Sequence, residues 1–277
     1  MLYLIATPIG NLEDITLRAL SVLKSCDYVL AEDTRKTQIL LSHFKISKKC
    51  ISFQKFSEKK QEAKVLADLQ NDKNIALLSD AGTPLISDPG ESLVKACIKQ
   101  KLPLTALPGA CSPINALVLS GFQSIPFQFR GFLKRKAGEL KKQILQMLSY
   151  SGTSIAFESP HRLIASLKLL QKLDPERKIS VAREMTKMFE ESVQGTAEEL
   201  IEYFSDDNHP LKGEIVLLME EKEYPLENNN ENDPNYLELE ELLTILKEKF
   251  SLTNKEALKL AAKILKTKKN VLYKKSL

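Results

Sequence analysis

The sequence predicts an α/β protein with two successive α/β domains and a small all-α domain after them. Apolar runs that end in polar loops and lead into helical patterns repeat along the first 120 or so residues, an order typical of a mainly parallel sheet with helices on its faces. Two adjacent extended segments, 178–183 and 188–193, indicate a hairpin and therefore a mixed second sheet. After an acidic stretch, apolar residues recur only with helical spacing.

The first domain, residues 1–121, is expected to contain strands bounded by turn-forming residues. These strands are Leu2–Ala6, Tyr28–Ala31, Ile51–Phe53, Ile75–Leu78 and Leu104–Leu107. Helices should follow them and end near Cys26, Phe44, Leu69, Lys99 and Leu119. Asp14 or Thr16 can cap the first helix, which should carry Leu17, Leu20 and Leu23 on one face.

The second domain, residues 122–220, begins after the turn-rich segment Gly121–Pro126. Its expected strands are Phe127–Phe132, Ser154–Phe157, Ile179–Ala182, Met188–Val193 and Glu214–Met219. Helices are expected up to Leu148, over Pro160–Leu170 and up to Phe204. Residues 221–235 are acidic, rich in asparagine and without periodicity, so they are expected to form a linker.

Residues 236–277 predict three short helices in a helix-turn-helix-like unit: Tyr236–Phe250, Asn254–Lys266 and Lys269–Tyr273. Thr253 or Asn254 is expected to cap the second helix. Its apolar stripe comprises Leu258, Ala261, Ala262 and Leu265. The formal net charge of the chain is only +4, but lysines are concentrated in this last region.

Composition predicts a globular protein of the cytoplasm. No apolar run has the length of a membrane helix, and the first residues lack the basic start of a signal peptide. The cysteines contain no C-x-x-C pair, so we expect reduced thiols: Cys26, Cys50, Cys97 and Cys111. The three histidines lie far apart in the sequence, which argues against a histidine metal site.

Familiar nucleotide-binding signatures are absent from the sequence. No two glycines are two residues apart, which excludes G-x-G-x-x-G, and no G-x-x-x-x-G-K-[ST] occurs. The chain is therefore not expected to be a Rossmann dehydrogenase or a P-loop nucleotidase. The G-x-S-x-G elbow of α/β-hydrolases is missing as well.

The most informative stretch is the loop at 79–90, which follows a buried strand and consists almost entirely of Gly, Pro, Ser, Thr and Asp. In open α/β sheets ligands bind at this end of the strands, where backbone groups are accessible. The two aspartates of the loop supply acceptors for hydroxyl or ammonium groups. Comparable segments follow other strands: 7–11, 32–35, 108–113, 158–162 and 183–187.

These strand-end segments fall into two kinds. Segments 7–11, 79–90 and 108–113 suit a cofactor held by backbone groups, whereas 32–35, 158–162 and 183–187 bring Glu, Asp and Arg together. Such paired charges can also be purely structural ion pairs. The basic run Lys134, Arg135 and Lys136 after an aromatic strand is either a solvated helix start or a contact for nucleic-acid phosphates.

Six of these motifs together resemble the ribosomal RNA small subunit methyltransferase I family. They are Thr-Pro-Ile-Gly-Asn at 7–11, Ala-Glu-Asp-Thr-Arg at 31–35, Ser-Asp-Ala-Gly-Thr-Pro at 79–84, Pro-Gly-Ala-Cys-Ser at 108–112, Phe-Glu-Ser-Pro-His-Arg at 157–162 and Ala-Arg-Glu-Met-Thr-Lys at 182–187. The resemblance implies a two-domain tetrapyrrole-methylase-like fold with S-adenosylmethionine held between the domains, and no metal. It also implies a homodimer and 2′-O-methylation of a cytidine ribose in the decoding region of 16S rRNA, with the rRNA presented within the small ribosomal subunit.

The resemblance also implies which residues hold the cofactor. From the first domain these are Pro8, Ile9, Gly10, Asp80, Ala81, Gly82, Thr83, Cys111 and Ser112. From the second domain they are Phe157, Ala182, Arg183 and Gly213.

A ribose hydroxyl is a weak nucleophile, so a base or a strong hydrogen-bond acceptor near it would assist methyl transfer. The candidate bases are Asp33, Glu158 and Glu184. Residues expected to bind or steer the RNA backbone are Arg35, Lys134, Arg135, Lys136, Arg162, Arg183 and Lys187.

Two other functions remain open at this point. One is methylation of a tetrapyrrole or of a protein side chain by an enzyme of the same class, although such a substrate would not need the lysine-rich C-terminal region. The other is a non-catalytic RNA-binding module, although none of the six motifs lacks an obvious part.

Overall fold

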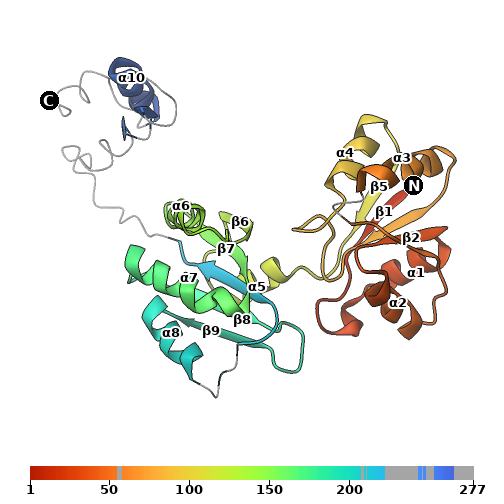
Figure 1. Ribbon diagram of the computed structural model, residues 1–277, viewed down its shortest axis with the longest axis horizontal. Helices are drawn as coiled ribbons and strands as arrows, with labels where there is room; N and C mark the ends of the chain where they lie inside the picture. The colour runs from red at the N-terminus through yellow and green to blue at the C-terminus, as the bar shows by residue number, and fades with distance from the viewer. Residues whose placement is uncertain are drawn as a thin grey trace. The chain divides into compact units, whose positions relative to one another are not determined.

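The computed structural model describes residues 1–54, 58–206, 209, 211–221, 243–244, 246–247 and 253–264, without the side chains of 58–60 and 263–264. It divides into two compact units, Met1–Glu223 and Tyr224–Leu277, and Figure 1 traces both. The predicted linker and the predicted helices Tyr236–Phe250 and Lys269–Tyr273 lie largely or wholly outside the described residues.

The first sheet of the larger unit is parallel throughout, as predicted, with strand order β3-β2-β4-β1-β5. Its strands are β1 (Leu2–Ile5), β2 (Tyr28–Ala31), β3 (Cys50–Ser52), β4 (Ile75–Leu78) and β5 (Leu104–Leu107). Leu78 is level with both Ile5 and Ala31, and Ile5 is level with Leu107. The loops that follow β1, β2, β4 and β5 therefore leave the sheet along one edge.

Helices cover both faces of this sheet (Figure 1). The 3-10 helix η1 (Leu12–Asp14), α1 (Leu17–Ser25) and α2 (Thr34–His43) lie on one face, and α3 (Glu58–Gln70) and α4 (Glu91–Lys99) lie on the other. Alternate strand residues point to opposite faces, so the sheet is apolar on both sides.

Helix α1 confirms one of the two predicted caps and corrects its predicted face. The hydroxyl of Thr16 accepts a hydrogen bond from the Ala19 amide. The buried stripe runs through Ala19 and Leu23, four residues apart, whereas Leu17 is 86% exposed. The prediction that Leu17 shares the buried face was wrong, because the first residue of the helix lies about a third of a turn away from that stripe.

The second sheet is mixed, as predicted, with strand order β6-β7-β10-β8-β9. Its strands are β6 (Phe127–Phe132), β7 (Thr153–Glu158), β8 (Ile179–Arg183), β9 (Glu191–Gly195) and β10 (Ile215–Met219). Only the β6–β7 pair is parallel. One face packs against α6 (Ala137–Leu148), α7 (Pro160–Leu173) and α8 (Ala197–Ser205).

The predicted strand at 188–193 is displaced along the chain. The antiparallel register of β8 and β9 sets Arg183 opposite Glu191, so residues 184–190 form the connecting turn and β9 extends to Gly195. Met188 and Phe189 lie exposed in this turn. Their apolar character suggested a strand, although they make no buried contact.

Helix α5 (Ser112–Ser120) packs against the second sheet although it follows the last strand of the first. Its Ala116 and Leu117 join a buried cluster with residues of β7, β8 and β10 on the face opposite to α6, α7 and α8. The chain thus reaches the second sheet before Gly121, where the sequence places the domain boundary. The boundary itself stays a prediction.

In the smaller unit, α10 (Asn254–Ile264) begins with Thr253 at its N-terminus, and Glu256 accepts hydrogen bonds from the Thr253 amide and hydroxyl at 2.9 and 2.6 Å. The predicted residues Leu258, Ala261 and Ala262 are buried. No helix within the described part of the chain is long and apolar enough to cross a membrane.

Candidate active site

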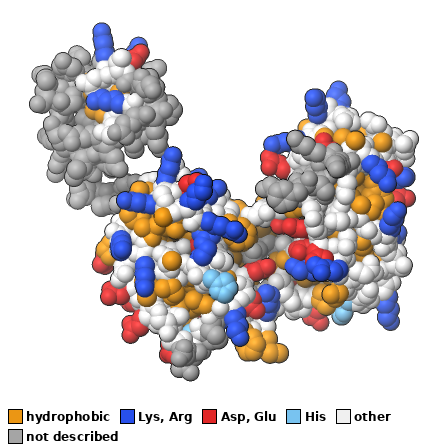
Figure 2. Space-filling model, in the orientation of Figure 1, with side chains coloured by type: hydrophobic (Ala, Val, Ile, Leu, Met, Phe, Trp, Pro, Cys, Tyr) orange, Lys and Arg blue, Asp and Glu red, His pale blue; other side chains and the backbone are white. Residues whose placement is uncertain are grey.

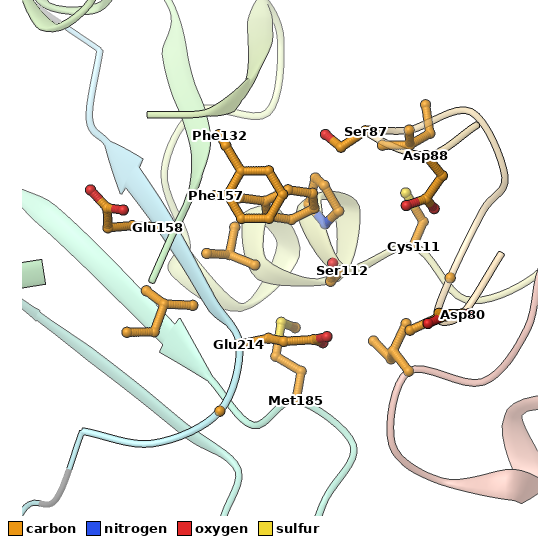
Figure 3. A pocket seen from close by; sticks show the side chains of 18 of the residues that line it. Asp80, Ser87, Asp88, Cys111, Ser112, Phe132, Phe157, Glu158, Met185 and Glu214 are labelled. Carbon is orange, nitrogen blue, oxygen red and sulfur yellow. The ribbon is translucent and has the colours of Figure 1, made fainter. Parts of the chain in front are cut away.

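A pocket of about 270 Å³ lies where the loops following β1, β4 and β5 face β7, β10 and the turn after β8. This volume is close to the lower end of the range of roughly 300 to 1,000 Å³ that is usual for small-ligand sites. Figure 3 shows Phe132 and Phe157 on one side of the pocket, with Asp88 and Cys111 on the other. The pocket is therefore built by both halves of the larger unit.

Most of the predicted cofactor residues line this pocket: Ile9, Asp80, Ala81, Gly82, Thr83, Cys111, Ser112, Phe157 and Gly213. Pro8, Gly10, Ala182 and Arg183 are not among the lining residues. Two of these residues lie directly behind the pocket wall. Gly10 is next to Ile9, and Ala182 belongs to the buried cluster that contains Met185.

The three backbone-rich loops are joined by hydrogen bonds. Thr7 and Gly82 exchange two backbone hydrogen bonds of 2.9 and 3.0 Å. The Ser79 hydroxyl donates to the Gly82 carbonyl at 2.9 Å, and the Thr83 hydroxyl donates to the Ala110 carbonyl at 3.1 Å. Gly82 has a φ of 79°, which favours glycine. These bonds hold the loops in one arrangement around the pocket.

The first loop also contacts the turn after β8, about 175 residues further along the chain. The Asn11 amide donates to the Thr186 hydroxyl at 3.1 Å. A Cβ on Gly10 would lie 2.4 Å from Cγ of Lys187 and 2.8 Å from the Met185 carbonyl oxygen, so only glycine permits this approach. The motifs at 7–11 and 182–187 thus pack directly on each other beneath the pocket.

Gly213 occupies a similar close contact on the other side of this turn. Its φ is 79°, and a Cβ there would overlap the Glu184 carboxylate. Glu184 in turn accepts a hydrogen bond from Lys187 at 2.8 Å. Glu184 therefore fills the space that the missing side chain leaves.

The electrostatic character of the pocket is acidic. Asp80, Asp88, Glu158 and Glu214 line it, and among the described lining residues there is no lysine or arginine. Figure 2 shows acidic side chains gathered in the hollow between the two α/β halves. Lys36 lies outside the lining and pairs with Asp80 at 2.9 Å. A ligand with positive charge suits this pocket better than one with phosphates.

Asp88 is the lining carboxyl with the most altered acidity. Burial raises its pKa from the ordinary 3.8 to about 7, the nearby carboxylates of Glu32, Asp80 and Glu214 add to the rise, and a hydrogen bond with the Ser79 hydroxyl opposes it. Burial also raises the pKa of Glu32, with Asp80 contributing. The sequence placed Asp88 in the right loop but could not distinguish it from Asp80.

We expect Asp88→Asn to raise the stability of the protein without ligand. The unfolded chain loses this proton near pH 3.8 and the folded chain near pH 7, so the wild-type protein loses stability as the pH rises between these values. The amide avoids that loss, which reaches up to about 4 kcal/mol above pH 7, at about 1.4 kcal/mol per pH unit between the two pKa values. Thermal unfolding at pH 5 and pH 8 measures the difference in stability between the variant and the wild type. This difference should be larger at pH 8 than at pH 5, and an equal difference at both pH values would contradict the expectation.

The three carboxylates predicted as bases are each engaged elsewhere. Asp33 caps α2 and pairs with Arg35 at 2.7 Å, which lowers the pKa of Asp33, and neither residue lines the pocket. Glu184 pairs with Lys187. Glu158 reaches the pocket but is buried, and its carboxylate accepts hydrogen bonds from the Ser159 amide at 2.8 Å and the Ser166 hydroxyl at 2.5 Å. Their catalytic roles stay predictions.

The predicted RNA-contacting cations also differ in their surroundings. Lys134, Arg135 and Lys136 are exposed between β6 and α6. Arg162 donates to the carbonyls of Leu133 and Lys134 at 3.1 and 2.7 Å, so it fixes the backbone at the end of β6. Arg183 is only 9% exposed and pairs with Glu191.

Several lining residues were absent from the sequence-based prediction: Ile86, Ser87, Asp88, Phe132, Met185 and Glu214. Met185 lies inside a motif that the sequence singled out, and Glu214 follows the predicted Gly213. Phe132 belongs to a predicted strand, but its position in the pocket depends on an irregularity of that strand that sequence periodicity does not reveal.

Comparisons with known proteins agree with this architecture. The family described as Tetrapyrrole (Corrin/Porphyrin) Methylases matches residues 1–201. The ribosomal RNA small subunit methyltransferase I of Vibrio cholerae is 45% identical over 281 residues, covering 99% of this chain and 93% of that protein. Its counterpart in Escherichia coli O157:H7 is 39% identical over 277 residues, covering 100% of this chain and 94% of that protein.

Solved structures are similar in fold. A diphthine synthase superposes with a TM-score of 0.60 at 14% identity, over 79% of this chain and 89% of that chain. A uroporphyrin-III C-methyl transferase from Thermus thermophilus, complexed with S-adenyl homocysteine, superposes with a TM-score of 0.53 at 18% identity, over 79% and 96% of the two chains.

Proposed function

Because this chain belongs to the ribosomal RNA small subunit methyltransferase I family of tetrapyrrole methylases, we propose that it methylates the ribose 2′-oxygen of a cytidine in the decoding region of 16S rRNA, with S-adenosylmethionine as donor. The observation that carries the proposal is the similarity to ribosomal RNA methyltransferases over 99% of the chain. Work on ribosomal subunits would take place in the cytoplasm.

The pocket fits the proposed donor in charge and in chemistry. S-adenosylmethionine carries a sulfonium and an ammonium group, and the carboxylates of Asp80, Asp88 and Glu214 suit both. Ile9, Phe157 and Met185 offer apolar surface, and the backbone of Ala81 and Thr83 offers hydrogen-bonding groups. No metal is part of the proposal.

When bound, the donor supplies an electrophilic methyl group. The residues of the chain then have two tasks. The joined loops and the apolar wall hold the reactants in line and exclude water. Asp88 would take the proton of the 2′-hydroxyl while the ribose oxygen forms its bond to the methyl carbon and the bond from that carbon to sulfur breaks. A carboxylate with a pKa near the working pH suits a general base.

The test of the proposal is incubation with radiolabelled S-adenosylmethionine and small ribosomal subunits from a strain that lacks this modification. Label on one cytidine ribose would support the proposal. Label on another nucleotide would show that the enzyme methylates a different position. No label, with donor binding intact by calorimetry, would overturn the proposal that this RNA is the substrate. Presenting free 16S rRNA in parallel would distinguish it from the assembled subunit as substrate.

We expect a chain that ends at Glu221 to bind the donor within twofold of the full chain but to bind RNA more weakly. The truncation removes the lysine-rich residues 255–277 and the whole smaller unit. Fewer phosphate contacts give a shallower dependence of affinity on salt. Filter binding between 50 and 200 mM salt measures how steeply RNA affinity falls with salt concentration. Equal slopes for both chains would contradict a role of the removed residues in RNA binding.

The proposal includes a homodimer. Helix α5 supports it, because Ile114, Val118 and Leu119 form an exposed apolar strip opposite its buried face. Light scattering of the purified protein tests this, and a monomer at micromolar concentration would contradict it.

A further inference from the structure

The strand β6 contains one extra residue that changes the direction of Phe132. Phe129 is level with Ile155 of β7, and Phe132 is level with Phe157, so three steps along β6 match two steps along β7. Gly131, with a φ of 64°, provides the turn in the backbone. In a regular strand Phe129 and Phe132 would point to opposite faces. The bulge places both on the face of Ile155 and Phe157, and Phe132 thereby lines the pocket.

Phe132 is held firmly in this position. Its ring lies 5.1 Å from that of Phe157, which in turn lies 5.0 Å from Phe129 in an edge-to-face arrangement. The Leu133 amide donates to the Phe157 carbonyl at 2.9 Å, and Arg162 binds the carbonyls of Leu133 and Lys134. Phe132 nevertheless remains 56% exposed while lining the pocket. A large, fixed and exposed aromatic ring at a pocket is therefore available for a ligand.

The loop at 79–90 approaches the same end of the pocket. A Cβ on Gly131 would lie 3.6 Å from the Ser87 hydroxyl oxygen, and Figure 3 shows Ser87 and Phe132 at the same end. Ile86 lines the pocket and is 39% exposed. Its neighbours Leu85 and Ser87 have φ values of 72° and 78°, which are costly for residues other than glycine. This strained backbone holds an aliphatic side chain exposed at the pocket.

We propose that Phe132 and Ile86 form a clamp for the base of the target nucleotide, with Phe132 stacking on its face. The inference rests on the proposed function, which requires that the nucleotide enter this pocket. Enzymes that modify one nucleotide hold its base between aromatic and apolar side chains, and proteins recognise unpaired RNA bases by aromatic stacking. Lys134, Arg135 and Lys136 are exposed two to four residues after Phe132, so they are available to contact the phosphates that flank the base.

The test compares Phe132→Leu, Phe132→Tyr and Ile86→Ala with the wild type on small ribosomal subunits. The matched control is Phe127→Leu, which removes a 39% exposed aromatic ring from the same strand outside the pocket lining. Calorimetry with S-adenosylmethionine shows that each variant is folded. We expect Phe132→Leu to lower kcat/KM for the subunit by about 10- to 100-fold, mainly through KM. Phe132→Tyr, Phe127→Leu and all donor affinities should stay within about threefold of wild type.

Three results would overturn the clamp. Activity of Phe132→Leu within twofold of wild type would remove the stacking role while the proposed function stood. A tenfold loss of donor affinity in Phe132→Leu would place the ring against the donor. A wild-type protein that labels no ribose would overturn the proposed function and the clamp with it.

Discussion

Asp88→Asn should lower the single-turnover rate of methyl transfer by about 10²- to 10⁴-fold at saturating donor, the usual effect of losing a general base. In the wild-type protein the base must be ionised, so kcat/KM for the donor should rise with pH and level off above about 7, where Asp88 loses its proton. The variant should show no rise in this range. Asn keeps the size of the side chain and its hydrogen-bonding oxygen, so the pocket should keep its shape.

The matched control for Asp88→Asn is Asp72→Asn, which changes an exposed aspartate in the turn before β4, at the edge of the sheet opposite to the pocket. It should leave the rate and the pH profile unchanged. Asp33→Asn and Glu184→Gln identify the base independently. If either of these abolishes the rise with pH while Asp88→Asn retains it, the base is one of the carboxylates predicted from the sequence, and the role of Asp88 as base is wrong.

Gly10→Ala should weaken the binding of S-adenosylmethionine by at least about 10-fold. The new Cβ would meet Lys187 at 2.4 Å and the Met185 carbonyl at 2.8 Å, so the loop at 7–11 must separate from the turn after β8. Ile9 and Met185, which line the pocket from the two sides of this contact, would then move apart. Small displacements matter at such a site, since a misplacement of about 1 Å in an active site can lower the reaction rate about 100-fold. Calorimetric titration measures the affinity.

Gly138→Ala provides the matched glycine control. Gly138 lies in the first turn of α6, and a Cβ there would have no atom within 4 Å. Alanine at this helical position should be neutral or slightly stabilising. Equal donor affinity for Gly10→Ala and Gly138→Ala, both folded by circular dichroism, would show that the contact between the loop and the turn does not shape the pocket.

Both sheets and most of the pocket wall could be predicted from the sequence because the signals are local. The strands Tyr28–Ala31, Ile75–Leu78 and Leu104–Leu107 are short apolar runs between turn residues, and the structure confirms their bounds. The loop at 79–90 could be predicted because its Gly, Pro, Ser, Thr and Asp residues follow a buried strand and because similar segments follow other strands of the chain.

What sequence reasoning missed depends on contacts between distant segments. Burial raises the pKa of Asp88, and Glu32 and Glu214, which lie far apart in the sequence, add to the rise. Phe132 faces the pocket because of one extra residue in β6, whereas the alternation of Phe127 and Phe129 alone would place Phe132 on the opposite face of the sheet. The start of β9 depends on its register with β8, and register is a property of two strands. Motif residues such as Arg183 are consequently identified from sequence more readily than their partners.

The position of β10 in the second sheet affects how this protein folds during its synthesis. β10 is the last strand of the larger unit, yet it lies in the middle of the second sheet, between β7 and β8, and all five of its residues are buried. The pairs β6–β7 and β8–β9 can form as the chain emerges from the ribosome, but the second sheet becomes continuous only when β10, which ends at Met219, is available to pair with β7 and β8. Glu214, Ile215 and Val216 also complete the wall of the pocket. A nascent chain that ends before these residues lacks part of the pocket wall, so we expect the pocket to be completed only late in synthesis.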